Sequence, residues 1–282
     1  MASTGNNGAI LRTEVVEDLL IRPVAAASVA TDPRVATVVR TLAPSVRFPV
    51  VLNDPAAAWV AEGGEIPISD LGTDEVNVVP GKLAALTVIT KELAEDSSPE
   101  AQSVVGAGLA RDLARKLDGA FFDTGGGVQP PGLAALPANT IYDLAIGATP
   151  TNLDAFGDAF AWVRGQGANP TAVLVNPTNL TQLGKIKEGT GSAKALLEPD
   201  PAKPTGRVVQ GVPLVPSSAV PAGTMWVVDS SRIYTVVKRN PEVVADASVF
   251  FTSDRVAVRA TMRAGFGFVH PGALVRMRFA AS

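Results

Sequence analysis

The stretch from Val46 to Leu93 constrains the fold of this chain more than any other. Two strand-like runs lead outward and two return, and Asn, Asp, Gly and Pro interrupt them repeatedly. Prolines inside strand-like runs favour edge strands or isolated ribbons over the middle of a sheet. A two-stranded hairpin is marginal in water because it cannot bury both of its faces. We therefore expect an extended arm that needs a surface outside itself.

The tip of this arm, "AWVAEGGEIPISD", is acidic. The stretch between Asn53 and Glu75 contains no Lys or Arg, and its acidic residues are Asp54, Glu62, Glu65, Asp70, Asp74 and Glu75. Glu62 and Glu65 have the residue type of a glycosidase carboxylate pair, but such a pair needs a concave pocket that desolvates one carboxyl. The spacing of the acids does not match a calcium-binding EF-hand loop. We interpret these acids as interface or solvated charges.

Composition narrows the class of protein. The chain has 282 residues, of which 46% are hydrophobic and 18% charged, as in a globular protein of one large or two ordinary domains. A net charge of -3 does not predict nucleic-acid binding by the chain as a whole. The absence of cysteine excludes disulfides and thiolate chemistry. The sequence shows neither a secretory signal nor an apolar run of about 18 residues, so we expect a soluble protein made inside the cell.

No motif predicts a catalytic, cofactor-binding or metal-binding residue. The single histidine is His270 in "FVHPGAL". The sequence contains no G-x-S-x-G motif whose serine a histidine could activate, so we interpret His270 as structural. The glycines of "GAGLARD" and "TGGGVQPPG" do not lie between a strand and the start of a helix, as a phosphate loop requires. They indicate a helix interior and a loop.

A long helix is predicted from Pro99 to Asp123. Ser98 and Pro99 are suited to its start, and the glycines at 125–127 end it. At 1.5 Å per residue it would be about 37 Å long. Its apolar stripe consists of Val105, Leu109, Leu113, Leu117 and Phe121. Gly106 and Gly108 weaken a helix, so we expect close packing there.

The rest of the chain alternates between helices and strands. Leu153, Phe156, Phe160 and Val163 have helical spacing, "TAVLVNP" is a short buried strand, and "GVPLVPSSAVPAGTMWVVD" supplies two more strands. In "DRVAVRATMR", apolar residues alternate with Arg255, Arg259 and Arg263, so one strand face is apolar and the other basic. These patterns predict an α+β fold.

The order of these elements resembles the major capsid proteins of tailed bacteriophages, the Hong Kong 97 fold family. The resemblance spans about Pro44 to Phe279 and includes "AWVAEGGEIPISD", "ELAEDS", "GGGVQPPGL", "LVNPTNLTQLGKIKEGTG" and "DRVAVRATMRAGFGFVHPGAL". It implies an N-terminal arm at 1–45, an extended loop at 46–92, and a spine helix with the first part of a peripheral domain at 93–136. It also implies an axial domain at 137–231 and the second part of the peripheral domain at 232–282.

The resemblance implies a structural shell protein and not an enzyme. Such a protein self-assembles into pentamers and hexamers of an icosahedral head in the host cytoplasm and becomes part of the virion capsid. It encloses double-stranded DNA, which it contacts non-specifically, and it needs no cofactor or membrane. A separate scaffolding protein, a portal and decoration proteins are the further partners implied. The alternatives are an encapsulin-like compartment shell, a tail or neck component and, with less support, a carboxylate-dependent hydrolase.

The predicted interface joins the acidic loop of one subunit to a basic surface of its neighbour, because complementary charge fixes register. The loop residues are Trp59, Glu62, Glu65, Ile66, Ile68 and Asp70. The candidate basic residues are Arg255, Arg259 and Arg263, or Arg111 and Arg115. Some family members form a covalent bond between a lysine near the loop tip and an asparagine of the peripheral strands. Here Lys82 and Lys91 are far from the tip and no Asn follows Asn240, so we predict no such bond.

Overall fold

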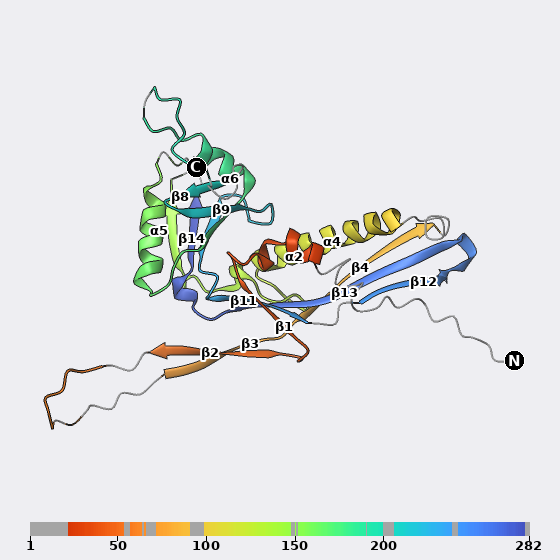
Figure 1. The fold of residues 1–282 in the computed structure, drawn as a ribbon, viewed down its shortest axis with the longest axis horizontal. Helices are drawn as coiled ribbons and strands as arrows, with labels where there is room; N and C mark the ends of the chain where they lie inside the picture. Colours follow the sequence, from red (N-terminus) through yellow and green to blue (C-terminus); the bar gives the residue numbers. More distant parts are fainter. Residues whose placement is uncertain are drawn as a thin grey trace.

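The computed structural model describes residues 22–53, 57–63, 65, 72–90, 99–147, 150, 152–189, 191–199, 206–238 and 242–279. Figure 1 shows an elongated lobe, a compact lobe beside one end of it, and a two-stranded ribbon that projects from their junction. Helices and strands are mixed throughout, which confirms the predicted α+β class.

The elongated lobe is a five-stranded sheet covered by a long helix. Its strands are β1 (Thr37–Thr41), β4 (Gly81–Thr90), β11 (Ile233–Lys238), β12 (Glu242–Phe250) and β13 (Arg255–Phe268). β13 pairs with β4 along one edge and with β11 and β12 along the other, and β1 runs parallel to β11. The short 3-10 turn η4 (Phe251–Ser253) joins β12 to β13.

The covering helix α4 (Pro99–Phe122) confirms the prediction of a long helix. Leu113, Leu117 and Phe121 of its apolar stripe are buried in one core with the apolar face of β13. The expectation of close packing was wrong at Gly108. A Cβ there would meet only Arg111 of the same helix, at 3.9 Å.

The compact lobe is built on a seven-stranded sheet. In spatial order its strands are β5 (Tyr142–Ile146), β14 (Val275–Phe279), β10 (Thr224–Val228), β6 (Ala172–Val175), β9 (Val212–Pro216), β8 (Arg207–Val209) and β7 (Glu198–Pro199). Its helices are α5 (Asp154–Gly165) and α6 (Pro177–Gly184), and the 3-10 turn η5 (Pro271–Ala273) packs beside α5. The 3-10 turn η3 (Leu133–Ala135) precedes this lobe and packs against α4. Asn176 caps α6 by accepting a hydrogen bond from the Thr178 amide, and Pro177 occupies its first turn.

Strand pairing in the compact lobe differs from the sequence prediction in one respect. The C-terminal strand β14 lies between β5 and β10, although the range 232–282 was expected to complete the other domain. The reason is long-range pairing: Val275 and Met277 enter the apolar core of the compact lobe. The chain therefore crosses between the lobes once more near its end.

Residues 22–41 belong to the body of the protein and not to a free arm. They form α2 (Arg22–Ala27), the 3-10 turn η2 (Val29–Thr31) and β1. Ala30, Val35 and Ala36 are fully or almost fully buried. The prediction of an arm at 1–45 was wrong for this segment, because its small side chains allow it to pack closely against α4 and β11. Residues 1–21 lie outside the described part of the chain.

The ribbon consists of β2 (Val46–Asn53) and β3 (Gly72–Val78), which pair antiparallel. An ion pair between Arg47 and Glu75, 3.1 Å apart, crosses the two strands. The ribbon is shorter than the expected loop at 46–92, because β4 leaves it and pairs with β13 over its full length.

Candidate functional site

The tip of the ribbon is exposed wherever the structure describes it, at residues 57–63 and 65. Trp59 is 105% exposed, and Val60, Glu62 and Glu65 are exposed as well. Burying one Trp removes 150 to 250 Å² of surface from water, worth roughly 4 to 6 kcal/mol at about 25 cal/mol per Å². Glu62 and Glu65 thus lack the desolvating pocket that a hydrolytic pair requires. The other predicted contact residues of the loop, Ile66, Ile68 and Asp70, lie outside the described residues.

The root of the ribbon is packed tightly on the sheet. The Phe48 ring stacks on Tyr234 of β11, with ring centroids 4.2 Å apart and an interplanar angle of 19°. Val78 lies directly over two glycines of β13, and a Cβ at Gly265 or Gly267 would come within 2.9 or 2.7 Å of its methyl carbons. The sequence analysis did not predict this contact of Val78 with the glycines. The glycines that alternate with phenylalanines in "RAGFGF" were a signal that another segment approaches the backbone closely there.

The sheet face opposite α4 carries the predicted basic residues of β13. Arg255, Arg259 and Arg263 are all exposed on this face, as their alternation predicted. The register places Leu86 opposite Arg259 and Lys82 opposite Arg263, and Val88 lies on the same face. We call this surface the basic sheet face, and its residues are Lys82, Leu86, Val88, Arg255, Arg259 and Arg263.

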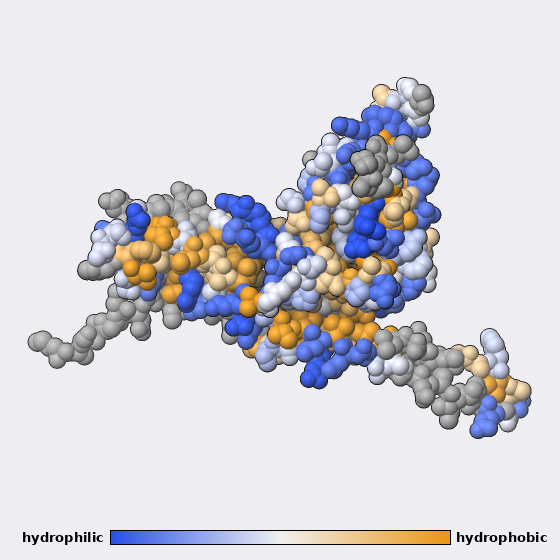
Figure 2. Space-filling view, turned by 180° about the vertical axis from the view of Figure 1, so that it is seen from behind, coloured by the Kyte–Doolittle hydropathy of each residue, from blue (hydrophilic) through white to orange (hydrophobic). Residues whose placement is uncertain are grey.

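The basic sheet face is amphipathic and largely unpaired. Leu86 is 66% exposed and Val88 40% exposed, so apolar side chains lie between the cations. Arg259 is 3.8 Å from Glu242 of β12, a weak exposed pair, and neither Arg255 nor Arg263 forms an ion pair with any described residue. Figure 2 shows hydrophobic patches beside hydrophilic residues along the elongated lobe and near the root of the ribbon.

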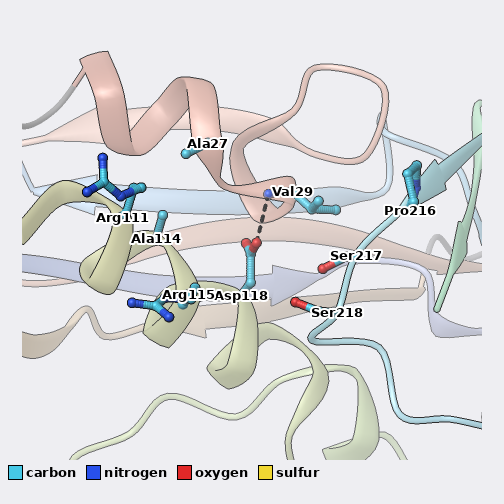
Figure 3. Close-up of a pocket in the computed structure, with 9 residues that line it drawn as sticks. All are labelled: Ala27, Val29, Arg111, Ala114, Arg115, Asp118, Pro216, Ser217 and Ser218. Atoms are coloured by element: carbon cyan, nitrogen blue, oxygen red, sulfur yellow. Dashed lines mark hydrogen bonds between the residues drawn. The ribbon is translucent and has the colours of Figure 1, made fainter. Parts of the chain in front are cut away.

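The second predicted basic pair, Arg111 and Arg115, lies elsewhere. Both side chains line an open cleft of about 410 Å³ between α4 and the turn after β9, where Ser217 and Ser218 face it (Figure 3). Arg115 also pairs with Asp112 of its own helix, at 3.4 Å. Because α4 covers the opposite side of the sheet, the structure separates these arginines from the basic sheet face.

A buried carboxylate, which sequence reasoning missed, lies at the floor of this cleft. Asp118 of α4 is 7% exposed and accepts hydrogen bonds from the Ser28 hydroxyl at 2.5 Å and from the Val29 and Ala30 amides at 3.1 Å each. Burial raises the pKa of the Asp118 carboxyl, while the hydrogen bonds from Ser28, Ala30 and Val29 act in the opposite direction. Asp118 lies four residues after Ala114 and three before Phe121, which are both buried, and this helical spacing was the available signal.

His270 is the other residue that the sequence raised as a catalytic candidate. His270 is half-buried, and burial together with the charge of Arg232 lowers its pKa, which favours the neutral ring. The ring forms no hydrogen bond with the described residues. Within the described ranges, no group of three or more His, Asp or Glu side chains is arranged to hold a metal ion. No helix in the described part of the chain has the length and apolar character needed to cross a membrane.

Comparisons with known proteins identify the class of protein that has this fold. A model of the phage capsid family matches residues 24–279. The chain therefore belongs to the phage capsid family, as the sequence resemblance predicted, and this is a family of structural capsid proteins and not of enzymes.

A curated relative and several solved structures agree with this. The chain is 28% identical over 191 residues to the capsid polyprotein of Pseudomonas phage PAJU2, a match that covers 62% of this chain and 27% of that protein. The chain thus spans only about a quarter of the length of this relative.

Among solved structures, the capsid of an empty GTA particle, computed with C5 symmetry, matches with a TM-score of 0.72 and 19% identity over 100% of this chain and 94% of that one. The structure titled Microbacterium phage Oxtober96 matches with a TM-score of 0.69 and 18% identity, covering 90% and 91% of the two chains. The structure titled Mycobacterium phage Bobi matches with a TM-score of 0.67 and 19% identity, covering 100% and 95%. At these identities the likeness shows the fold, which is that of Hong Kong 97-like capsid proteins.

Proposed function

We propose that this chain is a major capsid protein that assembles with copies of itself, as pentamers and hexamers, into an icosahedral phage head around double-stranded DNA. The observation that carries the proposal is the exposed ribbon tip. A fully exposed Trp59 beside Val60 is unfavourable in an isolated protomer and gains stability only when a partner covers it. The fivefold symmetry of the GTA capsid supports a ring of copies.

We infer that another copy covers the tip, because none of the described residues of its own protomer buries Trp59. Figure 1 shows the ribbon leading away from the junction, in the direction opposite to the far end of the elongated lobe. The root is fixed by the stacking of Phe48 on Tyr234 and by the close packing of Val78 on two glycines of β13. A ribbon fixed in this way cannot fold back onto its own basic sheet face.

The surface that best fits the tip is the basic sheet face of the neighbouring copy. Leu86 and Val88 offer apolar contact to Trp59, and the unpaired Arg255 and Arg263 offer charge to Glu62 and Glu65. Ile66, Ile68 and Asp70 belong to the same proposed contact. The cleft with Arg111 and Arg115 fits less well, because Arg115 already pairs with Asp112 and the cleft contains the Asp118 carboxylate.

The remaining assignments follow the same proposal. The ribbon is the extended loop, α4 is the spine helix, the elongated lobe corresponds to the peripheral domain and the compact lobe to the axial domain. Assembly takes place in the host cytoplasm, with a separate scaffolding protein, a portal and decoration proteins as partners. DNA is contacted through phosphate neutralisation by exposed Lys and Arg, without sequence preference.

The test is to express the full chain and examine it by negative-stain electron microscopy together with size-exclusion light scattering. We expect closed shells or rings of copies, with nuclease-protected DNA in particles recovered from infected cells. Particles filled with protein in place of DNA would favour an encapsulin-like compartment. A compact monomer at every concentration would contradict the proposal.

A further inference from the structure

Residues 28–41, which we call the strap, run along the junction of the two lobes. The strap begins beside α4, turns at Pro33 and ends as β1, the edge strand of the five-stranded sheet. On the elongated lobe, its Ala30 carbonyl accepts a hydrogen bond of 2.6 Å from the buried hydroxyl of Thr235. β1 then pairs in parallel with β11, from Thr37 to Thr41.

The same strap is also bonded to the entrance of β6 and to the crossover between the lobes. The Thr171 hydroxyl, just before β6, donates to the Arg34 carbonyl at 2.6 Å. The Thr37 hydroxyl donates to the Ser230 carbonyl at 3.0 Å, and the Ser230 amide donates to the Thr171 hydroxyl at 2.9 Å. The strap thus bridges the elongated lobe and the start of β6 in the compact lobe.

The side chains of the strap fill the core that the lobes share. Val35 and Ala36 belong to one buried cluster with Leu174 and Trp226 of the compact lobe and Phe266 of the elongated lobe. If the strap left its place, this cluster would be open to solvent at the junction. The strap therefore seals the contact between the lobes.

Asp118 holds the start of the strap through a small number of strong contacts. Its two carboxylate oxygens receive the Ser28 hydroxyl and the amides of Val29 and Ala30, and Figure 3 shows the carboxylate pointing from α4 at the strap. Hydrogen bonds to a carboxylate are stronger than neutral ones. Removing the carboxylate leaves buried amides without an acceptor, which costs more than the bond itself contributes.

We propose that the strap is a latch, a segment that opens separately from the rest of the protomer, and that hydrogen bonds to the buried Asp118 carboxylate keep it closed. An edge strand and one 3-10 turn can detach without breaking any other strand pair, so the latch opens at a lower free energy than the whole fold. Opening exposes the shared core to solvent and removes a constraint on the angle between the lobes. Because β2 begins shortly after β1, it also loosens one side of the ribbon root. This inference concerns the single protomer and does not depend on the proposed shell.

The test is hydrogen exchange, measured by mass spectrometry on the full chain. Asp118→Asn keeps the size of the side chain but replaces one acceptor oxygen with an NH2 group, which faces the donors of the strap. Asp112→Asn on the same helix changes only an exposed carboxylate and is the matched control. We expect Asp118→Asn to speed exchange about tenfold or more in residues 29–41 and in β11, with β6 and β10 unchanged. The control should match the wild type.

Two outcomes would overturn the proposal. Faster exchange at Val29 and Ala30 alone would show that Asp118 only caps the 3-10 turn η2 and does not hold the whole strap. A uniform increase through both lobes would mean that the strap is an inseparable part of the fold.

A second pair of variants keeps the test valid if Asp118→Asn does not fold. Thr235→Val and Thr171→Val each remove one hydroxyl that holds the strap, with little change in volume. Thr181→Val, which removes an exposed hydroxyl bond within α6, is their control. We expect the first two to speed exchange over the same segment by a smaller factor, and the same two outcomes would contradict the latch.

Discussion

The strap and the ribbon tip are two segments that lack a core of their own, and they are stabilised in different ways. The protomer buries several small side chains of the strap, including Ala30, Val35 and Ala36. The strap is also bonded to Asp118, Thr235 and Thr171 through its backbone. The tip carries a large aromatic residue, Trp59, that the described part of the protomer leaves fully exposed. We infer from this difference that the strap completes the protomer, whereas the ribbon tip is covered by an adjacent copy in the proposed shell. Variants can separate these two roles.

The largest expected effect is that of Trp59→Ala on assembly. Losing a buried Trp contact costs about 3 to 5 kcal/mol at each copy of the interface, so shells should fail to form at concentrations where the wild type assembles. The stability of the protomer should not change, because Trp59 is fully exposed there. Light scattering and urea unfolding measure the two quantities. The partially exposed Trp162 of the compact lobe supplies a control, since Trp162→Phe should leave assembly intact.

The next effect is a loss of protomer stability at the ribbon root. Gly267→Ala places a Cβ 2.7 Å from a methyl carbon of Val78, and such overpacking costs roughly 1 to 3 kcal/mol. Gly119→Ala is the matched control. It lies on the exposed side of α4 with open space around it and should stabilise the helix by up to about 1 kcal/mol. Equal urea midpoints for Gly267→Ala and the wild type would show that the root is not tightly seated.

The sequence predicted those features that depend on local pattern. The stripe through Leu113 and Phe121 predicted α4, and the alternation of Arg255, Arg259 and Arg263 predicted a strand with one basic face. Local patterns do not specify which distant strands pair. For this reason the sequence assigned β4 to the ribbon and β14 to the wrong lobe.

The parts that the sequence did not predict depend on close packing of small residues. The strap contains mainly Ala, Val, Ser and Thr, which have no period that marks a buried segment, so it was interpreted as an arm. Asp118 resembles a solvent-facing charge on a helix, and only the fold brings the amides of the strap to it. For the interface, the sequence supplied complementary charges but left two basic surfaces open. The geometry separates them and favours the basic sheet face.

The smallest expected effect is that of charge at the proposed interface. Reversing Arg255 and Arg263 to Glu should weaken assembly by about 1 kcal/mol per contact and change its dependence on salt. Combining these changes with Glu62→Lys and Glu65→Lys should restore assembly, because the pairing is rebuilt with opposite sign. The same reversals at Arg111 and Arg115 should have no effect on assembly. If reversals at Arg111 and Arg115 restored the assembly of the Glu62→Lys and Glu65→Lys variant, and reversals on the basic sheet face did not, the interface would lie at the cleft.

Disulfide trapping can test the contact between the ribbon tip and the basic sheet face directly, because this chain contains no cysteine. One protein carries Val60→Cys at the ribbon tip and a second carries Leu86→Cys on the basic sheet face, and the two are mixed, assembled and oxidised. We predict disulfide-linked pairs that form only in the mixture, while a mixture of Val60→Cys with Ser218→Cys in the cleft stays unlinked. Linked pairs with Ser218→Cys and none with Leu86→Cys would contradict the account, as would a Val60→Cys and Leu86→Cys double variant that closes the disulfide within a single monomer.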